Sequence, residues 1–214
     1  MRHVLLFNFL LTPCILMSQN DTVYFKNLNE ELSIKTVFGQ WMIKPVNEEK
    51  YSVRMKLPRN KRLDNAPKET NNLGQYRVTL SNNNSIDFSF INIGNPHAVI
   101  FSEDIASDPL ILWGDDLQQS KYFPNGVNLS LASIKSRTSM YLRIYERGVG
   151  ETMACGSGAG AATAVCRKQG LVDDTVEVEL PGGMVEVSWS GRDGLWLRGP
   201  TTTVYRGEIE FTVR

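Results

Sequence analysis

One segment of this 214-residue chain combines a strong helix signal with almost no side-chain bulk. Residues 154–169 are rich in alanine and glycine, and Gly170, a typical residue just beyond a helix C-terminus, follows them. Alanine is the best helix former, so we predict a helix over residues 154–169. Around it the sequence alternates apolar and polar residues, as strands do. We therefore expect an α+β fold in which mostly antiparallel strands surround one central, buried helix.

Apolar residues at every second position mark the expected strands, as in residues 51–57. Residues 108–122 are compatible with a short second helix. The polar, turn-rich stretch 58–74 is expected to cross between subdomains. The predicted strands cover residues 32–37, 40–46, 51–57, 76–80, 86–93, 98–101, 128–134, 140–145, 176–180, 184–189, 195–198, 202–205 and 207–213.

Charge and cysteine content narrow the class of function. Lys+Arg and Asp+Glu both number 23, so we expect neither a nucleic acid nor an acidic membrane as partner. Cys155 and Cys166 would lie roughly 16 Å apart on one helix, which is too far for a disulfide. Free thiols favour a reducing, cytoplasmic compartment. With two histidines and no Cys-x-x-Cys motif, we expect no metal site.

The head of the chain allows a second interpretation of its location. Residues 4–17 form an apolar run after a short basic start, as in a secretory signal peptide. However, Asn8 and Pro13 interrupt the run, and no small-residue cleavage site precedes Gln19. The run is also too short to span a membrane. A cytoplasmic protein is the favoured interpretation, and a secreted one is the alternative.

Cys155 stands where the predicted helix begins, directly before Gly156, Ser157 and Gly158. A helix N-terminus carries unpaired N–H groups and a partial positive charge, so it holds anions and favours a thiolate. The glycines let the backbone approach a ligand closely, and Ser157 adds a hydroxyl group. The pattern predicts a reactive thiol beside a carboxylate-binding loop. The alternative is a buried structural cysteine, which is our interpretation of Cys166.

Other polar residues lie at the ends of predicted strands. Glu146 and Arg147 precede the cysteine loop, and we expect Glu146 to hold a substrate ammonium; the alternative is a surface ion pair. Asn95 and His97 follow one strand and Asn128 starts another, so they are candidates for a cleft. The alternative role of His97 is that of a structural histidine, and the alternative role of Asn128 is that of a turn residue. We find no phosphate-binding glycine loop and no recognisable pyridoxal lysine, so we expect no cofactor.

Five motifs, in this order and spacing, resemble those of diaminopimelate epimerases. They are Gly94-Asn95-Pro96-His97, Tyr145-Glu146-Arg147-Gly148-x-Gly150-Glu151-Thr152, Ala154-Cys155-Gly156-Ser157-Gly158, Glu179-Leu180-Pro181-Gly182-Gly183 and Leu197-x-Gly199-Pro200. The resemblance covers roughly residues 30–214. It implies two similar halves, each a β-barrel-like sheet around a central helix, with the active site between them. It also implies cofactor-independent conversion of LL-diaminopimelate to the meso form, for lysine and peptidoglycan synthesis. The family often forms homodimers, but the oligomeric state of this chain is not readable from its sequence.

The resemblance further implies the roles of individual residues. In the family two cysteines, one per half, exchange protons on opposite faces of the α-carbon, and Cys155 matches the second of them. Helix N-termini would stabilise the carbanion and ease thiolate formation. The implied catalytic residues are Cys155, His97 and Glu146, and the implied substrate-binding residues are Asn95, Asn128, Glu146, Arg147, Gly156 and Ser157.

The first part of the chain departs from the family pattern. The Gly-Asn-Asp-Phe segment and the Cys-Gly-Asn-Gly-type loop of the first cysteine are not found, and Cys14 has no glycine loop. We expect residues 1–21 to be an unmatched head from a frameshift or miscalled start. Residues 22–66 with 204–214 would be a remnant of the first half, and residues 67–203 the second half. Three functions stay open: an epimerase with an incomplete site, a non-catalytic relic or binding module, and another pyridoxal-independent racemase.

Overall fold

The computed structural model describes residues 3–4, 22–23, 31–36, 39–47, 50–59, 74–201 and 208–209. The predicted strand at 202–205 lies outside these residues, as do most of the predicted crossing 58–74 and of the terminal strand 207–213. Neither helix in the described part of the chain is long and apolar enough to cross a membrane.

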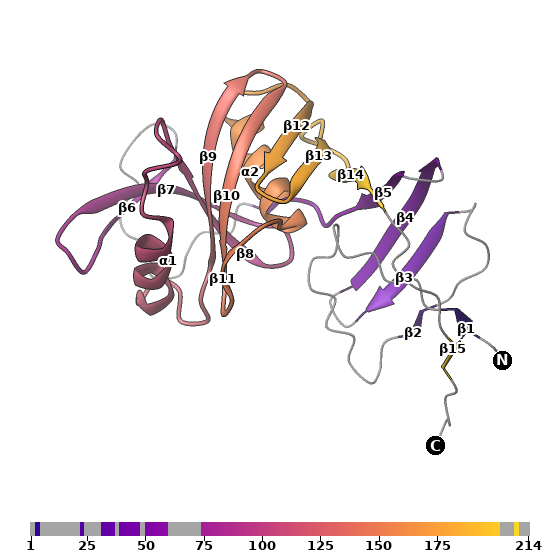
Figure 1. Cartoon of the computed structure of the whole chain (residues 1–214), viewed down its shortest axis with the longest axis horizontal. Coiled ribbons are helices and arrows are strands. Elements are labelled where there is room, and N and C mark those ends of the chain that lie inside the picture. Colours follow the sequence, from indigo (N-terminus) through magenta and orange to yellow (C-terminus); the bar gives the residue numbers. More distant parts are fainter. Residues whose placement is uncertain are drawn as a thin grey trace.

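The structure confirms an α+β fold made mostly of strands (Figure 1). Most predicted strands are present within one or two residues of their expected bounds. The strands are β1 (His3–Val4), β2 (Thr22–Val23), β3 (Leu32–Thr36), β4 (Gly39–Asn47), β5 (Lys50–Arg54), β6 (Tyr76–Thr79), β7 (Ser85–Asn92), β8 (Pro96–Phe101), β9 (Asn128–Ser136), β10 (Ser139–Glu146), β11 (Gly150–Thr152), β12 (Thr175–Leu180), β13 (Gly183–Ser188), β14 (Trp196–Pro200) and β15 (Glu208–Ile209). The helices are α1 (Leu110–Gln119) and α2 (Gly156–Lys168).

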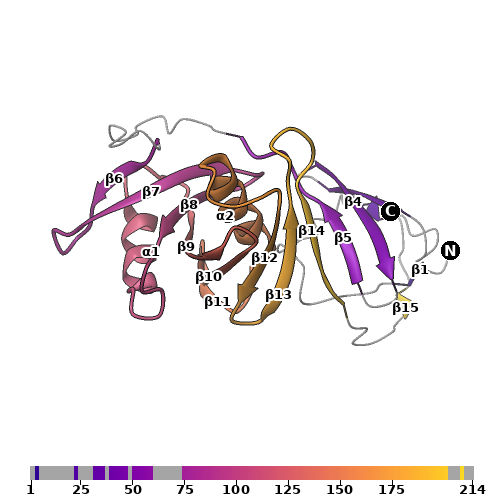
Figure 2. The same ribbon diagram turned by 90° about the horizontal axis from the view of Figure 1, so that it is seen from above.

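One large sheet bends around α2. Its strand order is β2-β3-β4-β5-β14-β13-β12-β10-β9-β8-β7-β6, and β11 pairs with β10 outside this path. Among the strand pairs of the described residues, β8–β9 and β10–β12 are parallel and the others are antiparallel. The two ends of the path, β2 and β6, are not paired with each other, so the barrel-like sheet is open over the described residues. Helix α2 packs against β7, β8, β9, β13 and β14, which places it inside the curve of the sheet (Figure 2).

The predicted division into two halves stays a prediction. Strand β5 belongs to the expected first half and β14 to the second, and the two are hydrogen-bonded neighbours. The sheet is therefore continuous across the expected boundary.

The small residues of α2 let the helix lie directly on the sheet. Every residue of the helix from Gly156 to Cys166 is buried, as the sequence predicted. A side-chain carbon at Gly158 would lie 2.5 Å from Cδ1 of Ile144 on β10, and one at Gly160 would lie 3.1 Å from Sδ of Met55. Because such spacing leaves no room for larger side chains, the composition of α2 and its burial have the same cause.

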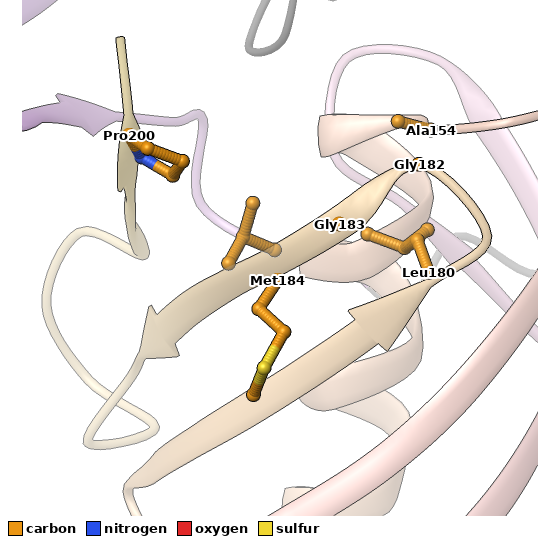
Figure 3. Close-up of a pocket in the computed structure, with 7 residues that line it drawn as sticks. Ala154, Leu180, Gly182, Gly183, Met184 and Pro200 are labelled. Atoms are coloured by element: carbon orange, nitrogen blue, oxygen red, sulfur yellow. The ribbon is translucent and has the colours of Figure 1, made fainter.

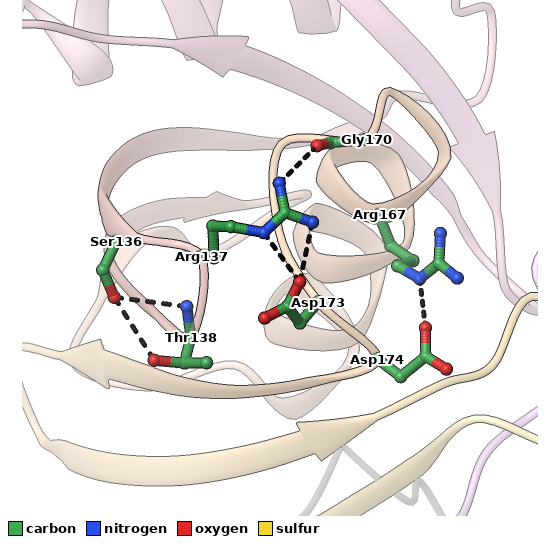
Figure 4. A network of polar contacts seen from close by, with 7 residues as sticks. All are labelled: Ser136, Arg137, Thr138, Arg167, Gly170, Asp173 and Asp174. Carbon is green, nitrogen blue, oxygen red and sulfur yellow. Dashed lines mark hydrogen bonds and ion pairs between the residues drawn. The ribbon is translucent and has the colours of Figure 1, made fainter.

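The C-terminal end of α2 is fixed to the strands beside it. Gly170 has φ +73°, as expected for the residue that ends a helix. Its carbonyl oxygen accepts a hydrogen bond from Nη1 of Arg137, which lies in the β9–β10 turn, at 3.2 Å. Figure 4 shows that Arg137 also pairs with Asp173, and Arg167 of the helix with Asp174. These contacts fix the helix at the end opposite to the predicted site.

Helix α1 covers the other face of the sheet. Its buried residues Leu110, Gly114 and Leu117 face a second apolar cluster formed with β6 to β10. A side-chain carbon at Gly114 would overlap the ring of Tyr145 on β10. The sequence predicted this helix over a longer range, 108–122, and it spans Leu110–Gln119.

Candidate active site

The predicted site residues meet at one end of the sheet. Strands β8 and β9 are parallel and both begin there, with His97 opposite Asn128. Strand β10 runs antiparallel to β9 and ends there, at Glu146. Helix α2 begins at the same end with Cys155 as its N-cap residue, and Asn95 forms a hydrogen bond to its first turn. Three strand ends and one helix start therefore bring these residues together.

Cys155 is a buried thiol, with a side chain that is only 3% exposed. Burial and the negative charge of Glu146 raise the pKa of the Cys155 thiol to about 12. Hydrogen bonds from the Ser157 hydroxyl, 3.4 Å from Sγ, and from the backbone N–H of Gly158 act in the opposite direction. The thiol form of Cys155 is favoured in this structure, because loss of hydration and a nearby carboxylate outweigh the helix N–H groups, which do favour a thiolate.

A chain of hydrogen bonds runs from Cys155 to His97. The Ser157 hydroxyl accepts a hydrogen bond from Nδ2 of Asn95 at 3.2 Å. Oδ1 of Asn95 lies 3.0 Å from Nε2 of His97. His97 is completely buried; this burial, with the positive charge of Arg147, lowers the pKa of its imidazole to about 3. His97 is therefore neutral near neutral pH, and its hydrogen-bonded link to Cys155 runs through two other side chains.

Glu146 is held beside the thiol by a residue that the sequence did not single out. Oγ1 of Thr152 donates a hydrogen bond to Oε1 of Glu146 at 2.7 Å. Thr152 lies on β11. A bidentate ion pair between Arg143 on β10 and Glu151 on β11, with N–O distances of 2.8 and 3.0 Å, holds the two strands together. Strand β11 was not predicted, because three residues are too few to show alternation. The only signal for Thr152 was its place in the quoted Glu146–Thr152 motif.

Asn128 joins two backbone segments of the site. Its Oδ1 accepts a hydrogen bond from the backbone N–H of Arg147 at 2.9 Å, and its Nδ2 donates one to the carbonyl oxygen of Pro96 at 3.3 Å. The Arg147 guanidinium donates to the carbonyl oxygen of Asn125 at 2.8 Å, while the residue as a whole is exposed. In this arrangement Asn128 orients the β10 end. Substrate binding by Asn128 and Arg147 stays a prediction.

The start of α2 supplies backbone donors to the site. The N–H of Ala159 is the first in the helix to bond backward, to the carbonyl oxygen of Cys155 at 2.9 Å. The N–H groups of Gly156 and Ser157 precede it in the first turn, where helix N–H groups have no partner within the helix. Both residues are buried. Helix N-termini are typical anion sites, and the binding of a carboxylate by Gly156 and Ser157 stays a prediction.

A small apolar hollow lies next to the site and does not include its polar residues. Its volume is about 40 Å³, enough for water rather than a ligand. Figure 3 shows the Pro181–Gly183 turn beside it, where the N–H of Gly182 donates to the carbonyl oxygen of Met153 at 2.7 Å. The turn thereby fixes the loop that leads to Cys155. The hollow is lined by Ala154, Leu180, Gly182, Gly183, Met184, Val185 and Pro200.

The described residues contain no cluster of three or more potential metal ligands.

The architecture is shared with racemases and epimerases of known structure, which defines the class of fold. A probable proline racemase from Agrobacterium radiobacter superposes with a TM-score of 0.62 at 13% identity, over 89% of this chain and 63% of that one. A hydroxyproline epimerase from Agrobacterium vitis, solved with trans-4-hydroxy-L-proline, gives a TM-score of 0.61 at 14% identity, over 92% of this chain and 61% of that one.

Sequence comparison identifies the family within that class. The diaminopimelate epimerase family profile matches residues 89–211. The diaminopimelate epimerase of Nitrosomonas eutropha is 34% identical over 187 residues, covering 86% of this chain and 67% of the relative. That of Acinetobacter baumannii is 39% identical over 135 residues, covering 63% of this chain and 48% of the relative. The chain belongs to the diaminopimelate epimerase family, and its matched region spans about half the length of relatives such as the latter.

Proposed function

We propose that this chain carries the Cys155 side of an amino-acid epimerase site that converts LL-diaminopimelate to the meso form without a cofactor, a reaction of lysine and peptidoglycan synthesis. Family membership supports the reaction class. The single observation that carries the proposal is the position of Cys155. It caps the buried start of α2 and is flanked by the Glu146 carboxylate and the Ser157 hydroxyl.

The proposed chemistry moves one proton at the α-carbon of the amino acid. In one direction the Cys155 thiol gives its proton to the carbanion, which forms a C–H bond and leaves a thiolate. In the other direction the thiolate removes the α-proton, and the C–H electron pair stays on the substrate. The N–H groups of Gly156 and Ser157 would hold the substrate carboxylate and stabilise the negative charge that spreads onto it.

The electrostatics of the site supports a coupling between substrate and thiol. Glu146 raises the pKa of Cys155 in this structure. A substrate ammonium placed against Glu146 would offset that charge and would lower the pKa of Cys155. The thiolate would then form mainly when the amino acid is bound, so Glu146 acts both on the substrate and on the protonation of the cysteine.

Inversion by two bases needs a second acid–base group on the opposite face of the α-carbon. Among the described residues, Cys155 is the one cysteine at this site. Cys166 is a buried core residue further along α2, as predicted, and Cys14 lies outside the described residues. Exchange of the α-proton with solvent is thus the reaction that reports on Cys155 alone.

The test is exchange of the α-proton of LL-diaminopimelate in D₂O, followed by NMR for the wild type, Cys155→Ala and Cys166→Ala. Cys166→Ala is the matched control, since it removes a buried thiol from the same helix. We expect Cys155→Ala to slow exchange by about 10²- to 10⁴-fold, because one acid–base group contributes a factor of that size. Cys166→Ala should retain most of the wild-type exchange rate. Exchange that is equally fast in Cys155→Ala would overturn the assignment.

The same assay separates the other functions. Exchange that depends on Cys155 for proline or hydroxyproline, and not for diaminopimelate, would show a racemase with another substrate. Binding of diaminopimelate in calorimetry without any Cys155-dependent exchange would show a binding module. Measuring the yield of meso product beside deuterium incorporation separates inversion from exchange with retention.

A further inference from the structure

Four buried side-chain atoms among the described residues have no hydrogen-bond partner. They are Nδ1 of His97, Oγ of Ser130, Oγ1 of Thr163 and Oε1 of Gln169. A buried polar group without a partner is costly, so each such atom calls for an explanation. Two of them, on His97 and Ser130, belong to neighbouring strands and to residues with no exposed surface.

The strand register puts these two residues on the same face of the sheet. His97 on β8 lies opposite Asn128 on β9, and Ser130 follows Asn128 by two residues. Residues two apart in a strand point to the same side. Val99, two residues after His97 and opposite Ser130, belongs to the apolar cluster around α2. His97 and Ser130 therefore both face α2, as diagonal neighbours on adjacent strands.

The other two unpartnered atoms belong to α2 and to the residue at its C-terminal end. His97 is linked through Asn95 to Ser157 in the first turn of α2. Thr163 lies six residues later in the helix, about 9 Å along its axis, and Gln169 about 18 Å along. Ser130 is thus the unpartnered buried hydroxyl on the strand that pairs with the strand of His97.

The hydrogen-bonding chemistry of the two atoms is complementary. Nδ2 of Asn95 donates to Ser157, so Oδ1 of Asn95 faces His97 and can only accept. Nε2 of His97 must then carry the proton. Nδ1 of the neutral ring is left as an acceptor, and the hydroxyl of Ser130 is a donor.

We propose that Ser130 is a positioning residue of the site: its hydroxyl donates to a buried water that in turn donates to Nδ1 of His97, and this bridge fixes the tautomer that orients Asn95 and Ser157 toward Cys155. The role of Ser130 in an active site rests on the proposed function, whereas its hydrogen-bonded link to His97 does not. Without this donor the ring is free to place its proton on Nδ1. Nε2 would then become an acceptor, and Asn95 would turn its amide to match.

The experiment compares Ser130→Ala with Ser130→Thr, which keeps the hydroxyl. The matched control is Ser133→Ala, because Ser133 is a buried serine of the same strand, an odd number of residues away and therefore on the other face. Two readouts are used. The ¹⁵N NMR signals of His97 report which nitrogen carries the proton, and the rate of Cys155 alkylation across pH reports the state of the thiol.

In the wild type we expect a protonated Nε2 and an Nδ1 signal shifted by hydrogen bonding. Ser130→Ala should remove that shift and change the Cys155 alkylation rate by about three- to tenfold, the effect of one hydrogen bond. Ser130→Thr should restore both, and Ser133→Ala should change neither. A wild-type His97 protonated on Nδ1, or unchanged signals in Ser130→Ala, would overturn the proposal. Because neither readout needs turnover, failure of the exchange assay would leave this result intact and would count only against the proposed function.

Discussion

Acidification should destabilise this protein through His97. The ring is completely buried, and burial together with the charge of Arg147 lowers its pKa from 6.5 to about 3. In the unfolded chain the ring is hydrated and has its ordinary pKa. Below pH 6.5 the unfolded state therefore binds a proton that the folded state does not bind. The free energy of unfolding must fall as the pH drops from 6.5 toward 3.

The size of this effect follows from the pKa difference. Each pH unit between the two pKa values costs about 1.4 kcal/mol for one group. Between pH 8 and pH 4.5 the loss is therefore about 3 kcal/mol, because two units of that interval lie between the two pKa values. Since single domains are stable by only about 5–15 kcal/mol, the loss is large enough to measure.

Urea unfolding at pH 8 and pH 4.5 tests this reasoning. His97→Gln does not titrate and keeps an N–H for Oδ1 of Asn95, so acidification should cost it about 3 kcal/mol less than it costs the wild type. His3→Gln removes the other histidine of the chain and should behave like the wild type. Equal acid losses in His97→Gln and the wild type would refute the burial argument.

Two other perturbations have clear expected outcomes. Burial raises the pKa values of Cys155 and Cys166 from 9.0 to about 12, so stability should fall above pH 9, by about 1.4 kcal/mol per pH unit for each thiol. In alkaline urea titrations Cys166→Ala should reduce the fall in stability by about 1.4 kcal/mol per pH unit, and an unchanged slope would contradict the shift. Gly114→Ala should lower stability by about 1–3 kcal/mol in urea unfolding, despite the better helix former, because its methyl group meets the ring of Tyr145. Ile111→Ala, on the exposed side of α1, is the control, and a Gly114→Ala protein as stable as the wild type would contradict the packing argument.

The central helix could be predicted because its composition and its environment depend on one another. A helix whose glycines lie against Ile144 and Met55 has room only for small side chains at the positions that face the sheet. The strands were readable for a similar reason, since a sheet with one face against α2 needs alternating residues. Alternation does not identify the neighbouring strand, however. Only the structure shows which strands are neighbours, including the parallel pairs β8–β9 and β10–β12 and the open edges of the sheet.

The site was predictable at the level of residue types and less so at the level of contacts. Polar residues at strand ends, such as Asn95 and Glu146, stand out against apolar strands, and the structure brings them together. The hydrogen-bond partners of these residues could not be predicted from the sequence. Thr152 reaches Glu146 because a short hairpin folds back, and Ser130 looks like an ordinary polar residue of an alternating strand. Contacts of this kind depend on register and rotamer, which a single sequence does not encode locally.

Cys155 shows why a rule based on the local sequence can predict the wrong direction for the pKa shift of a thiol. The helix start does stabilise a thiolate, and the Gly158 N–H lowers the pKa of Cys155 in this structure. That rule assumes a thiol that water can reach. Here the sheet curves over the first turn of α2, so the sulfur loses its hydration and lies beside Glu146. Both effects oppose the thiolate and are larger than that of the helix. The protonation state of this cysteine is therefore a property of the packed site, and a ligand that changes the charge around Glu146 would change it as well.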